Sequence, residues 1–178
     1  MDHLGGFIIF NMIIEEQEIP DFKVNYREAI RAIIFQQNKI LLVHSNKGDY
    51  KIPGGGIEGN ESHSECLIRE VVEETGFVNC IIKEKLGSVI ERKIDQYDNN
   101  ALFQMTSHYY LCELINDKRI AQQLDDYESA QEYSPEWVLL TDAIEQNEKI
   151  INSSETEKNE WLKREIFVLK KLKNTLIL

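Results

Sequence analysis

The stretch from Gly54 to Phe77, GGGIEGNESHSECLIREVVEETGF, constrains the fold of this chain more than any other. It opens with three glycines, and no glycine or proline interrupts residues 62–75, so this part is predicted to be a helix. Ser62 and Glu65 have the spacing of a capping box at the helix start, and Gly76 stands where a glycine commonly ends a helix. The sequence therefore predicts a glycine-rich turn that leads into a capped, acidic helix.

The acidic residues of this helix have a spacing that places them together. Glu70, Glu73 and Glu74 are expected on one face, with Arg69 one turn before Glu73, and Glu61 is close enough to reach the same face. Like charges repel, so the arrangement is unfavourable unless cations neutralise it. Oxygen ligands of this kind suit Mg²⁺ or Mn²⁺, which can polarise a phosphoryl oxygen.

Two explanations of the acidic helix compete at this point. It can be a solvated surface on which Arg69 and Glu73 make an ordinary ion pair, or it can be a metal site to which the glycine turn adds the backbone carbonyl of Gly54. The spacing favours the second, because the stretch resembles the Nudix box of the Nudix hydrolases. That box reads Gly, five residues, Glu, seven residues, then Arg-Glu-apolar-any-Glu-Glu-any-Gly-apolar. The matching residues run from Gly55 to Phe77 and are Gly55, Glu61, Arg69, Glu70, Val71, Glu73, Glu74, Gly76 and Phe77.

The resemblance implies a fold, a reaction and a cofactor. The fold is of the α/β class, an α/β/α sandwich around a mixed β-sheet. The reaction is the hydrolysis of a phosphoanhydride (pyrophosphate) bond in a nucleoside diphosphate derivative or nucleoside triphosphate, and it depends on Mg²⁺ or Mn²⁺. The alternative is a nucleotide-sensing Nudix domain without catalysis, although such domains usually lose box glutamates that are present here.

The resemblance also assigns roles to individual residues. By position, Glu70, Glu73 and Glu74 would bind the metal, and Arg69 would orient them by ion pairing. Glu61 would support them or bind a further ion. Glu70, Glu73 and Arg69 are thus the expected catalytic residues. One of these glutamates, or one from a later loop, would deprotonate the attacking water.

The later loop and the substrate contacts are less closely defined. Glu128 and Glu132 both fit the loop glutamate, and Glu132 is preferred as the further metal ligand, with a solvated acidic loop as the alternative. Arg92 is the candidate substrate-binding residue. The group that is linked to the nucleoside diphosphate in the substrate stays open. Three histidines, His44, His63 and His108, form no recognisable cluster in the sequence and receive no role.

Composition and charge limit the partners. The net charge of −11 over 178 residues argues against a nucleic-acid polymer, which needs a basic surface. A small phosphorylated substrate stays possible, although an acidic protein would need bound cations to accept it, and the resemblance implies that this substrate is a small nucleotide-type molecule. The three cysteines lack a metal-ligand spacing. No signal-peptide pattern and no apolar run long enough to span a bilayer is found, so a cytoplasmic protein without membrane association is expected.

The remaining sequence predicts one Nudix domain over residues 24–178, after an N-terminal extension of residues 1–23. Within this extension, Phe7–Ile14 is predicted to be an extra strand, a dimer contact or a poorly ordered arm, and a homodimer is an open alternative. The other predicted strands are Arg27–Phe35, Lys39–His44, Phe77–Ile94 with a bulge at Gly87, Leu102–Leu114 and Pro135–Leu140. Thr141 is expected to cap a short helix, Asp142–Gln146, and Glu155–Asn174 is expected to form an amphipathic terminal helix.

Overall fold

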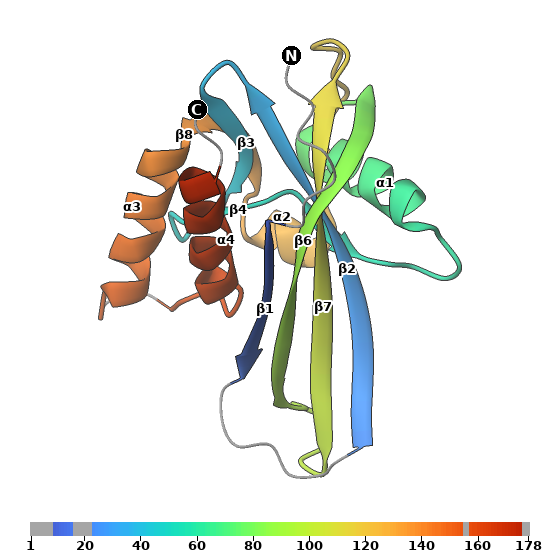
Figure 1. Cartoon of the computed structure of the whole chain (residues 1–178), viewed down its shortest axis with the longest axis vertical. Helices are drawn as coiled ribbons and strands as arrows, with labels where there is room; N and C mark the ends of the chain where they lie inside the picture. The colour runs from blue at the N-terminus through green and yellow to red at the C-terminus, as the bar shows by residue number, and fades with distance from the viewer. Residues whose placement is uncertain (1–8, 16–22, 155–156, 176–178) are drawn as a thin grey trace.

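A computed structural model describes residues 9–15, 23–154 and 157–175 of the chain (Figure 1). The strands are β1 (Phe10–Glu15), β2 (Lys23–Gln36), β3 (Lys39–His44), β4 (Tyr50–Lys51), β5 (Gly54–Gly56), β6 (Cys80–Ile94), β7 (Ala101–Leu114) and β8 (Ser134–Leu139). The helices are α1 (His63–Thr75), α2 (Asp126–Ala130), α3 (Leu140–Asn152) and α4 (Leu162–Thr175).

The strands form one mixed, eight-stranded sheet. Its main path runs β1-β6-β7-β2-β3-β4, while β5 pairs with β2 and β8 pairs with β3. Two pairs are parallel, β1 with β6 and β2 with β7, and the others are antiparallel. The α/β class and the mixed sheet predicted from the sequence are confirmed.

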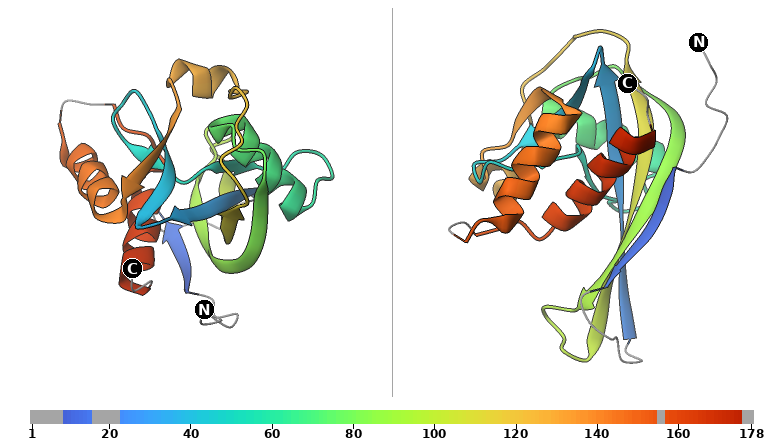
Figure 2. Two further views of the ribbon diagram at one scale, coloured as in Figure 1. Left: turned by 90° about the horizontal axis from the view of Figure 1, so that it is seen from above. Right: turned by 60° about the vertical axis from the view of Figure 1, so that its left-hand side comes forward.

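Helices cover both faces of this sheet. Helices α3 and α4 lie on one side of it and α1 lies on the other, as two views show (Figures 1 and 2). On β2, Ile33 belongs to the core cluster that includes Val168 and Leu169 of α4, whereas Ile30 belongs to the cluster that includes Leu67 of α1. Because both faces are covered, residues 29–34 are all buried and do not alternate with polar residues.

The N-terminal segment contributes a strand. Of the predicted segment Phe7–Ile14, residues 7 and 8 lie outside the described part, and β1 runs parallel to β6 from Phe10 onward. The Phe10 ring is buried and makes an edge-on contact with Tyr109, at 5.3 Å between ring centroids. Residues 10–15 of this segment therefore form an extra strand of the sheet.

Other predicted elements are confirmed or corrected. Strand β3 has the predicted bounds, and β6 has register shifts on either side of Lys85, next to the predicted bulge at Gly87. Thr141 does not cap α3. That helix begins at Leu140, its N-cap Leu139 makes no side-chain hydrogen bond, and the helix continues to Asn152, because β8 leads directly into it.

Two further segments differ from the predicted ones. The predicted acidic loop contains α2, and the terminal helix begins at Leu162 rather than at Glu155, a residue outside the described part. Within the described ranges, no helix combines the length and the apolar character needed to cross a bilayer.

Candidate metal and substrate site

The helix α1 is positioned by local signals at both ends. The Ser62 side chain accepts from the backbone N–H of Glu65, and the Glu65 carboxylate accepts from the backbone N–H of Ser62 at 2.8 Å. At the other end, Gly76 has a left-handed φ of 79°, and its N–H donates to the carbonyl of Val72. The predicted capping box and the glycine stop are confirmed.

The glutamates of α1 do not all point the same way. Glu70 and Glu74 are buried, on the side that meets the glycine turn, whereas the Glu73 side chain is 31% exposed. Ile68, an apolar residue of the same helix, is 41% exposed. The expected common face therefore divides into two buried carboxylates and one at the rim.

Arg69 ties the acidic residues together. Its Nη1 donates to Oε1 of Glu70 at 2.8 Å and to Oε2 of Glu73 at 2.9 Å, and its Nε donates to Oε1 of Glu61 at 3.0 Å. Its Nη2 donates to the carbonyl of Gly56 at 3.1 Å. One guanidinium thus fixes three of the predicted carboxylates relative to the glycine turn.

Glu74 is held by groups on the other side of the turn. Its Oε2 accepts from the N–H of Gly54 at 2.8 Å, and its Oε1 forms an ion pair with the buried ammonium of Lys51. The carbonyl of Gly54 accepts from Nη1 of Arg31 at 2.9 Å and from Nζ of Lys51 at 3.3 Å. Lys51 therefore places a positive charge beside both the carboxylate and the carbonyl that were predicted as metal ligands.

Glycine is required at position 54. Its φ is 139°, and a Cβ built there would lie 2.1 Å from the carbonyl oxygen of Ile30. A side chain would push the turn away from β2, and with it the backbone groups that meet Glu74.

Three carboxylates meet at this point. Oxygens of Glu70, Glu74 and Glu128 lie within 4.8 Å of one another. Burial, followed by the negative charge of Glu74, raises the pKa of both Glu70 and Glu128 to about 7. These shifts show that the positive charge present does not fully compensate the cluster, and the all-oxygen donor set fits a hard divalent cation.

The loop contributes Glu128 to this cluster and not Glu132. Glu128 lies in the short helix α2, where its carboxylate accepts from the backbone N–H of Asp125 at 3.0 Å. Glu132, the residue preferred from the sequence, follows the helix in a left-handed conformation with φ of 52°, and it is exposed. Asp125 and Glu128 have capping-box spacing in the sequence, a signal that could have indicated a local turn carrying Glu128.

A cavity of about 880 Å³ adjoins the carboxylates. Its lining includes Glu70 and Glu128 together with the basic residues Arg27, Arg31 and Arg92. This volume lies in the range of pockets that hold nucleotide-sized ligands. Negative and positive groups therefore both contribute to the cavity wall, as a bound cation and phosphates would require.

Arg92, predicted to contact the substrate, lies on this wall but is also paired. Its Nε donates to Oε1 of Gln104 at 2.8 Å, and its Nη1 forms an ion pair with Glu15 of β1 at 2.7 Å. The extra strand thus helps to hold Arg92 at the cavity.

Trp161 and Lys51 line the cavity without having been singled out in the sequence. The indole Nε1 of Trp161 is buried and has no hydrogen-bond partner within the described part of the chain. Buried donors are normally paired, so this N–H is available to a ligand in the cavity. Neither residue stands in a motif, and the sequence carries no signal that would have identified them.

Comparisons with known proteins relate this chain to one family. A family model described as NUDIX domain matches residues 25–173. The chain is 33% identical over 72 residues to an ADP-ribose pyrophosphatase of Methanocaldococcus jannaschii, and the matched stretch covers 37% of this chain and 43% of that protein. It is 30% identical over 113 residues to diphosphoinositol polyphosphate phosphohydrolase 2 of Homo sapiens, covering 61% of this chain and 54% of that protein. The chain therefore spans about half the length of these relatives.

A similar fold is found among solved structures. The NUDIX hydrolase from Nitrosomonas europaea superposes with a TM-score of 0.53 at 17% identity, covering 86% of this chain and 98% of that one. The similarity extends over nearly all of that structure and concerns the fold alone.

Proposed function

This chain belongs to the NUDIX family, and we propose that it is a divalent-metal-dependent enzyme that hydrolyses a phosphoanhydride bond in a nucleoside diphosphate derivative or nucleoside triphosphate. The observation that carries the proposal is the cluster of Glu70, Glu74 and Glu128, of which Glu70 and Glu128 line a nucleotide-sized cavity. An exposed acidic helix would not bury two carboxylates against a third from a distant loop, because burying like charges costs free energy.

Each group of the site has a proposed part in this reaction. Glu70, Glu74 and Glu128 hold Mg²⁺ or Mn²⁺, and the Gly54 carbonyl is a further candidate ligand. When bound, the cation supplies the positive charge that offsets the phosphate oxygens of the substrate. Arg69 orients Glu70 and Glu73 through its hydrogen bonds. The proton of the attacking water passes to one of the glutamates of this site.

The cavity indicates how the rest of the substrate is recognised. Arg27, Arg31 and Arg92 supply charge for phosphates, which an acidic protein would otherwise repel. Phe103 and Tyr127 also line the cavity and are suitable for stacking on a base, and the free N–H of Trp161 can donate to a polar group.

A substrate panel tests the proposal. Purified protein with Mg²⁺ or Mn²⁺ is incubated with nucleoside triphosphates, nucleotide sugars, dinucleoside polyphosphates, ADP-ribose and a diphosphoinositol polyphosphate, and the products are separated by chromatography. The last two compounds are included because the relatives carry those names. We expect metal-dependent cleavage of a phosphoanhydride bond in at least one nucleotide. Binding without cleavage across the panel would instead support the nucleotide-sensing alternative.

Glu128 and Glu132 can be distinguished by matched substitutions. Glu128→Gln preserves the cap of α2 but removes a charge from the cluster, so we expect kcat/KM to fall by about 100-fold or more. Glu132→Gln changes an exposed residue outside the cluster, and we expect a much smaller effect. Steady-state kinetics on the best substrate of the panel measure both. The reverse order of effects would restore Glu132 as the ligand.

The metal-free protein should lose stability as the pH rises. The folded pKa of Glu70 and Glu128 is about 7, against an ordinary value of 4.5, so the folded state keeps protons that the unfolded state has released. Stability contributed by the protonated forms is therefore lost between pH 4.5 and about pH 7. A divalent cation binds the ionised carboxylates and should reverse this loss.

Thermal unfolding with and without Mg²⁺ measures the effect. We expect Mg²⁺ to raise Tm clearly at about pH 8 and to change it little at about pH 5. At pH 8, a Mg²⁺ concentration of 100 times Kd would add about 2.7 kcal/mol to the free energy of unfolding. NaCl at equal ionic strength is the control. Equal shifts at the two pH values would contradict binding at these carboxylates.

A further inference from the structure

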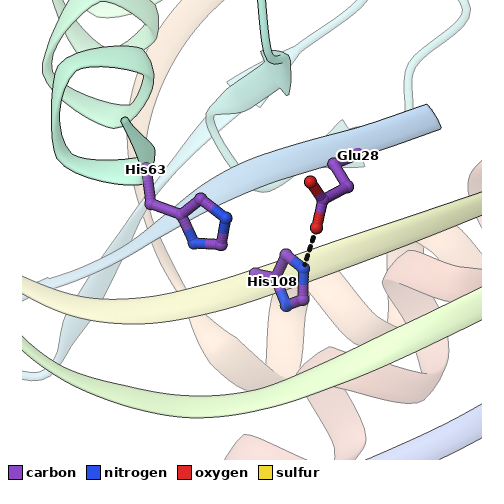
Figure 3. Close-up of side chains that lie close together, drawn as sticks. All are labelled: Glu28, His63 and His108. Atoms are coloured by element: carbon purple, nitrogen blue, oxygen red, sulfur yellow. Dashed lines mark hydrogen bonds and ion pairs between the residues drawn. The ribbon is translucent and has the colours of Figure 1, made fainter. Parts of the chain in front are cut away.

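A second cluster of metal-ligating side chains lies away from the acidic site. Glu28 of β2, His63 of α1 and His108 of β7 come together, as Figure 3 shows, and their ligand atoms lie within 4.8 Å of one another. Nε2 of His108 is 3.0 Å from Oε1 of Glu28, and the rings of His63 and His108 stack with centroids 4.9 Å apart. The fold thus brings together His63 and His108, which formed no recognisable cluster in the sequence.

The two imidazoles are held, but one of them is not fully paired. Nδ1 of His63 is 2.8 Å from the hydroxyl of Tyr110. This contact fixes the ring and leaves Nε2 of His63 as the nitrogen that could bind a metal ion. Nδ1 of His108 is buried and has no hydrogen-bond partner in the described part of the chain. Because Nε2 is the nitrogen that meets Glu28, Nδ1 lies on the other side of the ring, and Nε2 is the atom of His108 that would join this cluster.

His108 lies in a partly buried environment that disfavours its charged form. Burial lowers its pKa below the ordinary value, against the opposing effect of its hydrogen bond to Glu28. The neutral imidazole is the form that binds metal ions. The carboxylate of Glu28 beside it is exposed and can accept a positive charge without prior desolvation.

This cluster is separate from the substrate cavity. Arg27 and Ala29 line the cavity, so Glu28 between them on β2 faces the opposite side of the sheet. Phe103 and Met105 of β7 also line the cavity, and His108 has the opposite parity on that strand. The cluster therefore lies on the α1 side.

We propose that Glu28, His63 and His108 form a binding site for a borderline-soft transition-metal ion, with Zn²⁺ as the expected occupant. Imidazole nitrogen suits Zn²⁺ and its neighbours in the first transition row, whereas Mg²⁺ and Ca²⁺ select oxygen ligands. Two histidines and one carboxylate leave a fourth position for water in a tetrahedral site. The His63 side chain is partly exposed and the Glu28 side chain is exposed, so both have room to rotate toward one ion.

The three ligands come from three elements, so the ion ties the first turn of α1 to β2 and β7. The backbone carbonyl of Glu28 accepts from the N–H of Ile57 at 3.1 Å, directly after the glycine turn. Binding here should therefore stabilise the segment that carries the acidic site without supplying any of its ligands.

Metal titration of the full chain tests the proposal. Mg²⁺ is kept in large excess to occupy the carboxylate cluster, Zn²⁺ affinity is measured by calorimetry, and Co²⁺ serves as a visible-absorbing probe. We expect one Zn²⁺ per chain and Co²⁺ bands of a four- or five-coordinate nitrogen-containing site. His108→Gln and Glu28→Gln should each weaken Zn²⁺ binding by more than about 100-fold, beyond the roughly 10–100-fold loss that follows removal of a merely supporting hydrogen bond.

His44→Gln is the matched control. His44 also lies beside a carboxylate, with Nδ1 3.3 Å from Oε1 of Glu136, and beside an aromatic ring, Tyr50 at 4.7 Å, but it belongs to neither metal-ligand cluster. It should leave Zn²⁺ affinity unchanged. Because Glu28 is exposed, Glu28→Gln keeps the test valid if His108→Gln fails to fold.

Several outcomes would overturn the proposal. These are unchanged affinity in Glu28→Gln or His108→Gln, an equal loss in His44→Gln, a thiolate-to-cobalt band that locates the ion at cysteine, or no binding once Mg²⁺ is in excess. None of them bears on the hydrolysis proposed above, because the titration requires no substrate and the variants leave the carboxylate cluster intact.

Discussion

The Glu70→Gln variant is expected to lose about 10³-fold in kcat/KM, which corresponds to about 4 kcal/mol of transition-state stabilisation. In the proposed site, the charge of Glu70 helps to hold the cation between α1 and the α2 loop, and an amide cannot supply it. The fold should tolerate the change. Burial raises the pKa of Glu70 to about 7, so its protonated form, which glutamine resembles in shape, is already well populated at neutral pH in the metal-free protein.

Stability measurements separate lost chemistry from lost folding. Without metal at about pH 8, Glu70→Gln should melt no lower than the wild type, because it avoids the ionisation that costs the wild type stability. Mg²⁺ should raise the Tm of Glu70→Gln less than it raises the Tm of the wild type. Glu145→Gln on α3, an exposed residue, is the control and should behave as wild type in both assays. Activity within tenfold of wild type for Glu70→Gln would remove Glu70 from the proposed ligand set.

The Arg164→Met variant is expected to lower the free energy of unfolding by about 3–5 kcal/mol, the cost of breaking a buried ion pair from one side. Arg164 is 1% exposed, its Nη2 pairs with Glu165 at 3.0 Å, and its Nη1 pairs with Glu91 of β6. The carboxylate of Glu165 is fully buried and also accepts from the N–H of Ile52 at 2.8 Å. Removing the guanidinium would leave that carboxylate without its cation at the junction of α4, β4 and β6.

Denaturant unfolding measures this prediction, with Lys170→Met as the control on the same helix. The Lys170 side chain is half exposed and pairs with Glu148 at 2.5 Å, also partly exposed, and such surface pairs contribute about 0–1 kcal/mol. A loss below about 1 kcal/mol in Arg164→Met would show that the buried network tolerates a missing cation.

The parts of the fold predicted from the sequence are those that local chemistry decides. Ser62, Glu65 and Gly76 define α1 because each acts within one turn of the helix end. The turn at Gln37 and Asn38 joins β2 to β3, between the two strands that the sequence predicted at Arg27–Phe35 and Lys39–His44. The predicted start of α3 was wrong. Thr141 has the residue type of a helix cap, but the chain passes directly from β8 into the helix, so the N-cap is Leu139.

For the site, the sequence by itself determined the acidic register of α1 and its attachment to a glycine turn. Only the tertiary structure decided which carboxylate joins Glu70 and Glu74, because the choice between Glu128 and Glu132 depends on how the α2 loop returns to the sheet. The same holds for Lys51 beside Glu74 and for Glu28 with His63 and His108. These contacts join residues far apart in the chain, and the sheet register that brings them together arises from packing on both of its faces rather than from any local pattern.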